Sequence, residues 1–260
     1  MKTIVMKFGG AAVATPEHFS RVAEIIISRR EEYQRIVVVV SAMGDTTNQL
    51  IALANKVNPD PPRREYDMLV TVGERMSCSL LAMALAAKGH QALSFTGSQA
   101  GIITCPKHTE ARIIDVRPMR VLPLLDSGKI VIVAGFQGVS RGGEITTLGR
   151  GGSDTTAVAL GVALKATVVE FFKDVLGVYD KDPKNHSSAH FYDKLDYEKA
   201  YQVCKGSRIL HPRCIRLAEK NNQLLNIRSF ITYGSAEDNK STIIYNDQGS
   251  LNGPFFEEED

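Results

Sequence analysis

Short apolar runs alternate with stretches of helical spacing along most of this chain. The segments Arg35–Ser41, Lys129–Phe136 and Thr167–Phe172 are largely apolar and rich in β-branched residues, which is typical of strands covered on both faces. After the first strand, Thr15-Pro16-Glu17 has the cap, early proline and early acid that start a helix, and apolar residues follow at helical spacing through Tyr33. This alternation predicts an α/β fold with a mainly parallel sheet between layers of helices.

The rest of the pattern completes the expected order of elements. Segment 65–88 is helical in pattern with Gly73 as an interruption, and 58–64 and the glycine-rich stretch 138–152 are predicted to be loops. Segment 248–260 lacks periodicity, and its acidic end, 257–260, is predicted to be solvated. Further helices are expected at 48–57, 119–126, 154–166 and in two pieces of 197–222, and further strands at 3–8, within 92–104, and at 112–116, 225–231 and 241–245.

Composition narrows the class of protein without indicating a partner. Of 260 residues, 43% are hydrophobic and 23% are charged, and the formal net charge is +2, as in ordinary globular domains. The basic residues are scattered, which argues against nucleic-acid binding. The apolar stretch at the N-terminus is too short, and polar residues follow it too early, for a signal peptide. The longest purely apolar run, Ile36–Val40, is far too short to span a membrane. Four separated cysteines without a CxxC pair indicate reduced thiols and no metal site, so a cytoplasmic protein is expected.

Three polar segments that contain glycine follow apolar strands and precede helices: Lys7–Gly10, Ser41–Asn48 and Thr147–Asp154. Ligands of open α/β sheets bind beyond the carboxyl ends of the strands. Glycines there let backbone N–H groups approach phosphate oxygens, and a helix N-terminus favours negative charge. The chain has no GxxxxGK[ST] loop and no early GxGxxG. Each segment alone is more often structural, but together a lysine, an arginine and an aspartate beside glycine turns fit phosphoryl transfer, which depends on cations and positioning.

These segments make the chain closely similar to the catalytic domain of aspartokinases, in the amino acid kinase superfamily. The second loop, VVVVSAMGDTT at Val37–Thr47, is of the aspartokinase type. The resemblance implies a three-layer αβα sandwich. It also implies one kinase domain over residues 1–247, followed by a short acidic tail at 248–260. The N-terminal part of this domain would bind the amino acid, and the part from about residue 150 would bind the nucleotide. The other matching stretches are Lys7–Gly10, Val72–Ser77, Ser94–Gly101, Val133–Gly138, Thr146–Thr156 and Asp174–Tyr179 with Asp182-Pro183.

The resemblance further implies phosphoryl transfer from MgATP to the side-chain carboxylate of aspartate. Lys7 would neutralise the transferring group and Asp154 would organise that lysine, although Asp154 alone also fits a helix cap. Arg150 would grip the α-carboxylate, because a guanidinium fork matches a carboxylate, and Glu74 would meet the α-ammonium group. Hydrogen bonds to the substrate would come from Ser41, Thr47 and Ser153.

On the nucleotide side, the resemblance implies glycines that admit the phosphates and polar residues that hold adenosine and phosphates. Mg²⁺ would be held largely by phosphates and water, with no protein metal site. The family usually has Ser or Thr at Lys173. The family usually has Arg at the position of Lys184 and Lys at the position of Arg208, so the two residue types have changed places. Arg and Lys are not interchangeable at a forked contact. The glycines are Gly9, Gly10, Gly151 and Gly152, and the other residues are Lys173, Asp174, Tyr179, Lys184 and Arg208.

Several alternatives fit the same residues. Aspartokinases continue into small regulatory domains, and a dozen tail residues cannot form one. The expectation is therefore a kinase without built-in feedback, acting as a homodimer or with a separate regulatory subunit. A paralogue that phosphorylates an aspartate-like acid in specialised metabolism is a second interpretation. Acetylglutamate or uridylate kinase activity is disfavoured, because those substrates lack one or both groups that Glu74 and Arg150 would grip. The presence of Lys7 and Asp154 disfavours a non-catalytic regulatory subunit.

Overall fold

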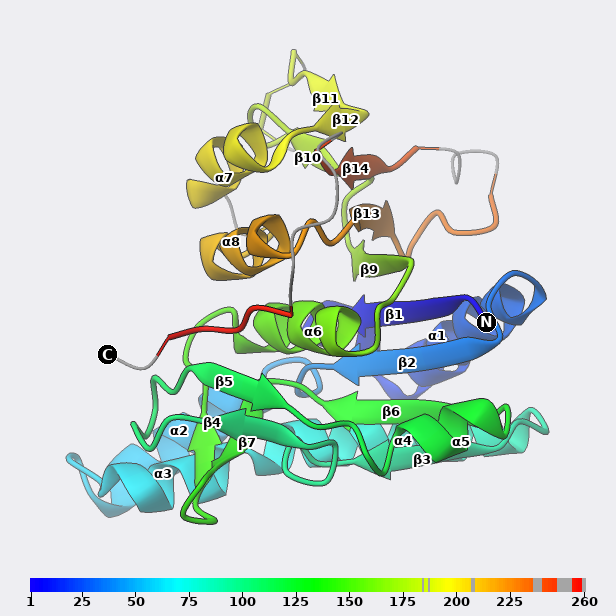
Figure 1. Cartoon of the computed structure of the whole chain (residues 1–260). Helices are drawn as coiled ribbons and strands as arrows, with labels where there is room; N and C mark the ends of the chain where they lie inside the picture. The colour runs from blue at the N-terminus through cyan, green and yellow to red at the C-terminus, as the bar shows by residue number, and fades with distance from the viewer. Residues whose placement is uncertain (184, 187, 207–208, 236–239, 247–253, 259–260) are drawn as a thin grey trace.

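An eight-stranded sheet forms the centre of the protein (Figure 1). The structure is a computed structural model of residues 1–260, and it describes all of them except 184, 187, 207–208, 236–239, 247–253 and 259–260. Six neighbouring strands are parallel and the two at one edge run the other way, so the predicted mainly parallel sheet is confirmed. In spatial order the strands are β12 (Lys194–Leu195), β14 (Thr242–Ile244), β13 (Leu225–Ser229), β9 (Val168–Lys173), β1 (Thr3–Phe8), β2 (Arg35–Val40), β6 (Ile130–Ala134) and β3 (Ala92–Phe95).

Helices cover both faces of this sheet, which makes the three-layer sandwich. The first face carries α1 (Pro16–Ser28) and α4 (Val72–Ala87), and the second carries α5 (Leu122–Asp126), α6 (Gly152–Ala163) and α8 (Pro212–Lys220). Alternate residues of β1 serve the two layers: Ile4, Met6 and Phe8 pack with the first, and Val5 packs with the second. Because both faces are buried, the strands are apolar without alternation. The remaining helices are α2 (Thr46–Val57), α3 (Arg63–Val70) and α7 (Tyr197–Lys205), with 3₁₀ turns at Gly10–Val13 and Arg29–Glu31.

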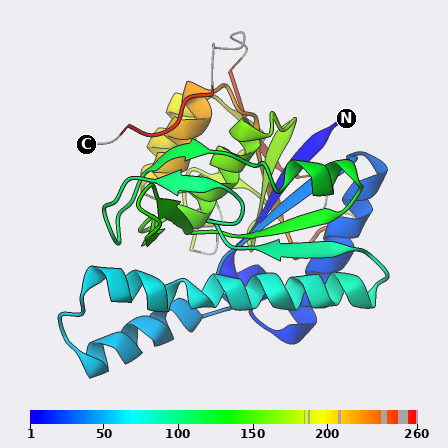
Figure 2. The ribbon, with the colours of Figure 1, turned by 60° about the horizontal axis from the view of Figure 1, so that its bottom comes forward.

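The segment predicted as one interrupted helix is two helices, and the break lies at Thr71 instead of Gly73. Figure 2 shows α3 and α4 following one another across the molecule. Gly73 serves a different purpose: a Cβ there would lie 2.7 Å from the Cβ of Ala42, so glycine lets α4 approach the loop after β2. The stretch Arg63–Ala87 is long and apolar enough to pass a length-and-hydropathy test for a membrane span. The test concerns length and composition only, one such helix is weak evidence for a membrane span, and 44% of the tested window is buried within the protein.

Part of the glycine-rich segment 138–152 belongs to a second, four-stranded sheet. Its order is β5-β4-β7-β8, and β4 and β7 are its parallel pair. The loop prediction for 138–152 is therefore wrong at 138–140 and 145–147, which belong to β7 and β8. The strands β4 and β5 lie within segments predicted as strands, whereas β7 and β8 were missed because three- or four-residue strands such as Gln137-Gly138-Val139-Ser140 carry too few apolar residues to show a period. The bounds are β4 (Ile102–Thr104), β5 (Ile113–Val116), β7 (Gln137–Ser140) and β8 (Ile145–Thr147); a further pair is β10 (Val178–Tyr179) with β11 (Phe191–Tyr192).

Residues 254–258 lie against the body of the protein, which corrects the prediction of a solvated acidic end at Glu257; residues 259–260 lie outside the described residues. The Glu257 side chain is only 13% exposed and forms an ion pair with Arg213 of α8. The main chain of Glu257 also donates a hydrogen bond to the carbonyl of Ile113, at the outer edge of β5. The next residue, Glu258, is exposed as predicted. The four cysteines are free and buried, in agreement with reduced thiols.

Candidate active site

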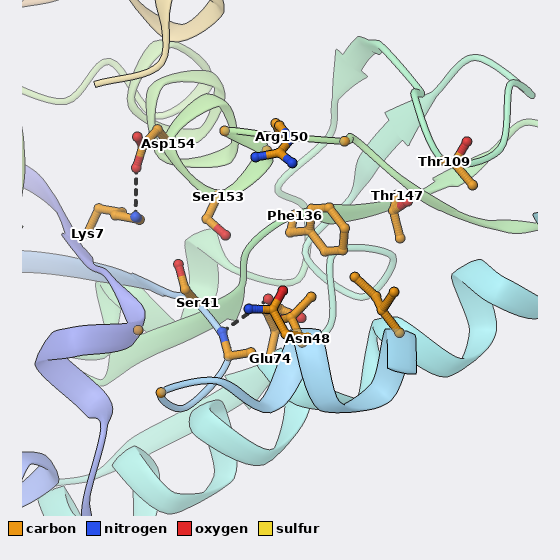
Figure 3. Close-up of a pocket in the computed structure, with 18 of the residues that line it drawn as sticks. Lys7, Ser41, Asn48, Glu74, Thr109, Phe136, Thr147, Arg150, Ser153 and Asp154 are labelled. Atoms are coloured by element: carbon orange, nitrogen blue, oxygen red, sulfur yellow. Dashed lines mark hydrogen bonds and ion pairs between the residues drawn. The ribbon is translucent and has the colours of Figure 1, made fainter. Parts of the chain in front are cut away.

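A pocket of about 560 Å³ opens at the carboxyl ends of β1, β2 and β6, beside the start of α6 (Figure 3). This is the edge at which open α/β sheets bind ligands. The structure brings all seven predicted catalytic and substrate-binding residues to its wall, together with three of the four predicted phosphate-loop glycines. They are Lys7, Ser41, Thr47, Glu74, Arg150, Ser153 and Asp154, with Gly10, Gly151 and Gly152.

At one end of the pocket a carboxylate lies between two lysines, of which only Lys7 lines the pocket itself. Lys7 Nζ at the end of β1 lies 2.7 Å from Asp154 Oδ1 in the first turn of α6, and Lys173 Nζ at the end of neighbouring β9 lies 3.5 Å from Asp154 Oδ2. All three side chains are at most 14% exposed. Burial works to raise the pKa of Asp154, but the two ammonium groups outweigh it and hold the pKa at about 2. Burial, assisted by the nearby Lys7, lowers the pKa of Lys173. The cluster therefore presents a permanent carboxylate and two cations, with net charge near +1.

The floor of the pocket contains a carboxylate that is only half satisfied. Glu74, in the first turn of α4, is 3% exposed. Its Oε1 accepts a hydrogen bond of 3.0 Å from the main-chain N–H of Ala42, but its buried Oε2 has no partner among the described residues. Burial raises the pKa of Glu74 to about 7. An unpaired buried acceptor is costly unless a ligand supplies a donor, so this oxygen marks a place for a cationic or N–H-donating group.

An unpaired guanidinium lies across the pocket from this carboxylate. Arg150 belongs to the loop between β8 and α6, on the side opposite Glu74 in Figure 3. Its side chain is exposed and makes no hydrogen bond or ion pair with any described residue. Gly149 and Gly151 on either side both have φ of +71°, a conformation that glycine adopts without strain. The pocket thus offers a free cation opposite a half-free anion.

Three of the four predicted phosphate-loop glycines are required by contacts within the protein. A Cβ at Gly10 would lie 2.9 Å from the carbonyl oxygen of Ala42, and one at Gly151 would lie 2.1 Å from the His211 ring. Gly152 is similarly enclosed by neighbouring side chains. Only Gly9, which does not line the pocket, leaves space, with Lys7 Nζ 3.7 Å away. The close approach of other parts of the protein is therefore enough to explain why three of these positions are glycine.

A buried carboxylate that the sequence analysis missed supports the far wall. Asp67 of α3 is fully buried and accepts hydrogen bonds from Thr147 Oγ1 at 2.6 Å and from the main-chain N–H of Thr109. It also contacts His108 Nδ1 at 2.8 Å. The sequence feature that could have indicated Asp67 is its position seven residues, or two helical turns, before Glu74 in the same helical pattern. Two wall residues, Tyr66 and Thr109, lie outside every polar segment or motif that the sequence indicated, and three more lie inside such segments without having been assigned a role: Asn48, Phe136 and Thr147.

The predicted nucleotide-side residues are only partly brought together. Lys173 pairs with Asp154, but Lys173, Asp174 and Tyr179 do not line the pocket. Tyr179 packs edge-on against Phe191, with ring centres 5.1 Å apart. Lys184 and Arg208 lie outside the described residues. Among the residues that the structure describes, no group of three or more His, Cys, Asp or Glu side chains could hold a metal ion.

Comparison with known proteins places this chain in a family. The model of the amino acid kinase family matches residues 2–232. The aspartokinase of Mycolicibacterium smegmatis is 48% identical over 246 residues, which is 94% of this chain and 57% of that protein. Aspartate kinase from Synechocystis superposes with a TM-score of 0.83 at 38% identity, over 97% of this chain and 41% of that one. E. coli aspartokinase III in complex with aspartate and ADP also gives 0.83, at 26% identity, over 95% and 65%. This chain spans little more than half the length of the curated relative, and it belongs to the amino acid kinase family.

Proposed function

We propose that this protein is an aspartate kinase, which transfers the γ-phosphoryl group of MgATP to the side-chain carboxylate of L-aspartate and forms 4-phospho-L-aspartate. The observation that carries the proposal is a buried Glu74 oxygen facing Arg150 across one pocket, neither of which has a partner among the described residues. An α-amino acid offers the complementary ammonium and carboxylate groups on one carbon. The aspartokinase relatives, one of them solved with aspartate and ADP, support the same substrate.

In this pose the substrate spans the pocket. The α-ammonium group donates to Glu74 Oε2, and the α-carboxylate takes the fork of Arg150. The hydroxyls of Ser41, Thr47 and Ser153 line the space between and can hydrogen-bond the substrate. The side-chain carboxylate then faces the Lys7–Asp154 end, where the phosphoryl group arrives.

The chemistry needs charge neutralisation and no proton transfer. An aspartate side-chain carboxylate is already ionised at pH 7, so one of its oxygens attacks the γ-phosphorus while the bond from that phosphorus to the bridging oxygen of ADP breaks. Lys7 stabilises the charge on the transferring oxygens. Asp154, with its pKa near 2, is no proton acceptor at neutral pH; it holds Lys7 and Lys173 in place.

The nucleotide enters as MgATP, with Mg²⁺ as part of the substrate. The carboxylate nearest the phosphoryl position, Asp154, is engaged by two lysines, so phosphate oxygens and water are the fitting ligands for the ion. We assign Lys173 and the main chain at Gly9 to the phosphates. Asp174, Tyr179, Lys184 and Arg208 are assigned to the rest of the nucleotide on the family resemblance alone.

The activity can be tested with a coupled assay of ADP release over a panel of amino acids, with hydroxylamine present to trap an acyl phosphate. Aspartate is expected to give ADP and a hydroxamate in equal amounts. Faster turnover of an aspartate-like acid would favour the paralogue dedicated to specialised metabolism. If none of the acids in the panel gives ADP release, the non-catalytic regulatory subunit is the remaining interpretation.

The raised pKa of Glu74 gives this activity a characteristic pH dependence. Below about pH 7 the empty carboxyl is protonated and neutral, so its attraction for the ammonium group is lost. We expect kcat/KM for aspartate, measured at saturating MgATP, to fall as the pH is lowered through about 7. Glu74→Gln should have a low and flat profile over the same range. If kcat/KM of that variant still fell as the pH was lowered through about 7, the pH dependence would have to come from another group.

We also propose that residues 1–260, assayed on their own, are not subject to feedback inhibition by amino acids. Allosteric control needs a separate site whose affinity differs between two states. Among the described residues, the elements after position 232 are β14 and the docked segment 254–258. Millimolar lysine, threonine and methionine are therefore expected to leave the initial rate unchanged at sub-saturating aspartate. Non-competitive inhibition would place an effector site inside the kinase fold. A homodimer, a separate regulatory subunit and a cytoplasmic location remain part of the proposal.

A further inference from the structure

The segment 254–258 makes a specific set of contacts beside the pocket. Asn221, at the end of α8, donates to and accepts from the main chain of Phe255, at 2.8 Å each. Glu257 then pairs with the edge of β5: its N–H donates to the Ile113 carbonyl at 2.9 Å, and its Oε2 accepts the Ile113 N–H at 2.8 Å. Figure 1 shows this segment, in red, passing between α8 and β5. An edge strand is thereby covered.

Glu257 also fixes the guanidinium of Arg213. Both carboxylate oxygens accept from Arg213, one of them from Nη2 at 2.6 Å. The same guanidinium donates through Nη1 to the carbonyl of Leu148 at 2.6 Å and through Nη2 to the carbonyl of Ala111 at 2.7 Å. Such a bidentate pair fixes the plane of the guanidinium, so the direction of the Leu148 contact is set by Glu257.

Leu148 leads directly into the loop that carries Arg150. The next three residues are Gly149, Arg150 and Gly151, and both glycines have positive φ, so the loop has little stiffness of its own. It is held from α8 at two points: Arg213 holds the Leu148 carbonyl, and His211 packs on Gly151. Arg150 itself has no described partner to hold it. Its position therefore depends on these neighbouring contacts.

We propose that Glu257 is a positioning residue for substrate recognition, which acts through Arg213 and the Leu148 carbonyl to hold the 149–151 loop and Arg150 at the pocket. The inference rests on the proposed function only where it assigns Arg150 to the α-carboxylate. Loss of this contact leaves the fold and the Lys7–Asp154 cluster in place but loosens the grip on the amino acid.

The matched test is Glu257→Gln against Glu258→Gln, because both remove one negative charge from neighbouring residues and only the first touches Arg213. We expect Glu257→Gln to raise KM for aspartate about 10-fold, the cost of weakening one charged hydrogen-bonded contact, with KM for ATP changed less than twofold. Glu258→Gln should match the parent. Arg213→Lys, which keeps the charge but loses the fork, should behave like Glu257→Gln, and the double variant should be no worse than either single variant.

Hydrogen exchange separates this inference from the proposed function. The N–H groups of Leu148 and Gly152 are hydrogen-bonded to Phe136 and Gly149, and their exchange needs no substrate. We expect the peptide that spans 148–152 to exchange roughly fivefold faster in Glu257→Gln than in Glu258→Gln. Faster exchange without kinase activity would retain the positioning role and reject the function. Equal exchange, or KM values for aspartate and ATP that rise together, would overturn the positioning role.

Discussion

Replacement of Lys7 by methionine is expected to lower kcat by about 100-fold or more, because a cation at the transferring phosphoryl group acts mainly on transition-state charge. KM for aspartate should stay within about threefold of the parent value, since Glu74 and Arg150 are the residues assigned to its α-ammonium and α-carboxylate groups and Lys7 is assigned to the transferring phosphoryl group. The measurement is steady-state kinetics with both substrates varied. The variant is expected to fold, because Lys173 still pairs with Asp154 after the change.

Lys2→Met is the control for this experiment, since it makes the same substitution at an exposed position just before β1. It should retain parental kcat. A folded Lys7→Met protein with near-normal kcat would falsify the role of Lys7. The cluster would then be interpreted as a structural ion-pair network, with the phosphoryl group elsewhere.

Replacement of Glu74 by glutamine should raise KM for aspartate by about 10- to 100-fold, the range expected when one partner of a buried charged contact is lost. Glutamine fits the same space and can still accept from Ala42, but it places an N–H₂ donor where Oε2 now faces the pocket. The N–H₂ group of the glutamine and the ammonium group of the substrate are both donors, so they cannot form a hydrogen bond with each other. Arg150→Ala should give a similar rise through the other end of the molecule, while KM for ATP changes little in both variants.

N-acetylaspartate provides the sharper measurement, because it keeps both carboxylates and lacks the ammonium group. The parent enzyme should strongly prefer aspartate, and Glu74→Gln should lose most of that preference. Glu65→Gln and Arg63→Ala, at exposed positions of α3, are the matched controls. Efficient use of N-acetylaspartate by the parent would reject the Glu74 assignment and favour an acetylamino-acid kinase.

The central sheet could be predicted from sequence because its strands are buried on both faces. Val37 to Val40 and Ile130 to Val133 are fully buried, so apolar residues stand at every position and the signal is strong. Two strands of the second sheet, β7 and β8, could not be predicted in the same way. They are three or four residues long, and β8 contains the polar Thr146, whose Oγ1 lies 2.6 Å from Thr104 Oγ1 of β4, so they show no apolar period in the sequence.

The candidate site divides along a similar line. Residues such as Lys7 and Arg150 lie in loops or strand ends that contain recognisable motifs, so sequence indicated them and the structure brings them to one pocket. Supporting residues were invisible because their partners are distant in sequence. Asp67 contacts residues 41 to 80 positions away, and Arg213 contacts carbonyl groups 65 and 102 positions away. No local pattern encodes such pairings.

The enclosed glycines limit how this pocket could change its substrate. A side chain at Gly10, Gly151 or Gly152 would meet protein atoms less than 3.0 Å away, so the backbone frame around the phosphoryl end has little freedom to vary. Acceptance of a longer or differently substituted acid would therefore have to come from side chains that line the open volume, such as Ser41, Thr47 and Ser153. Divergence of substrate range on this scaffold would then be concentrated in a few hydroxyl-bearing positions, while the glycine turns stay the same.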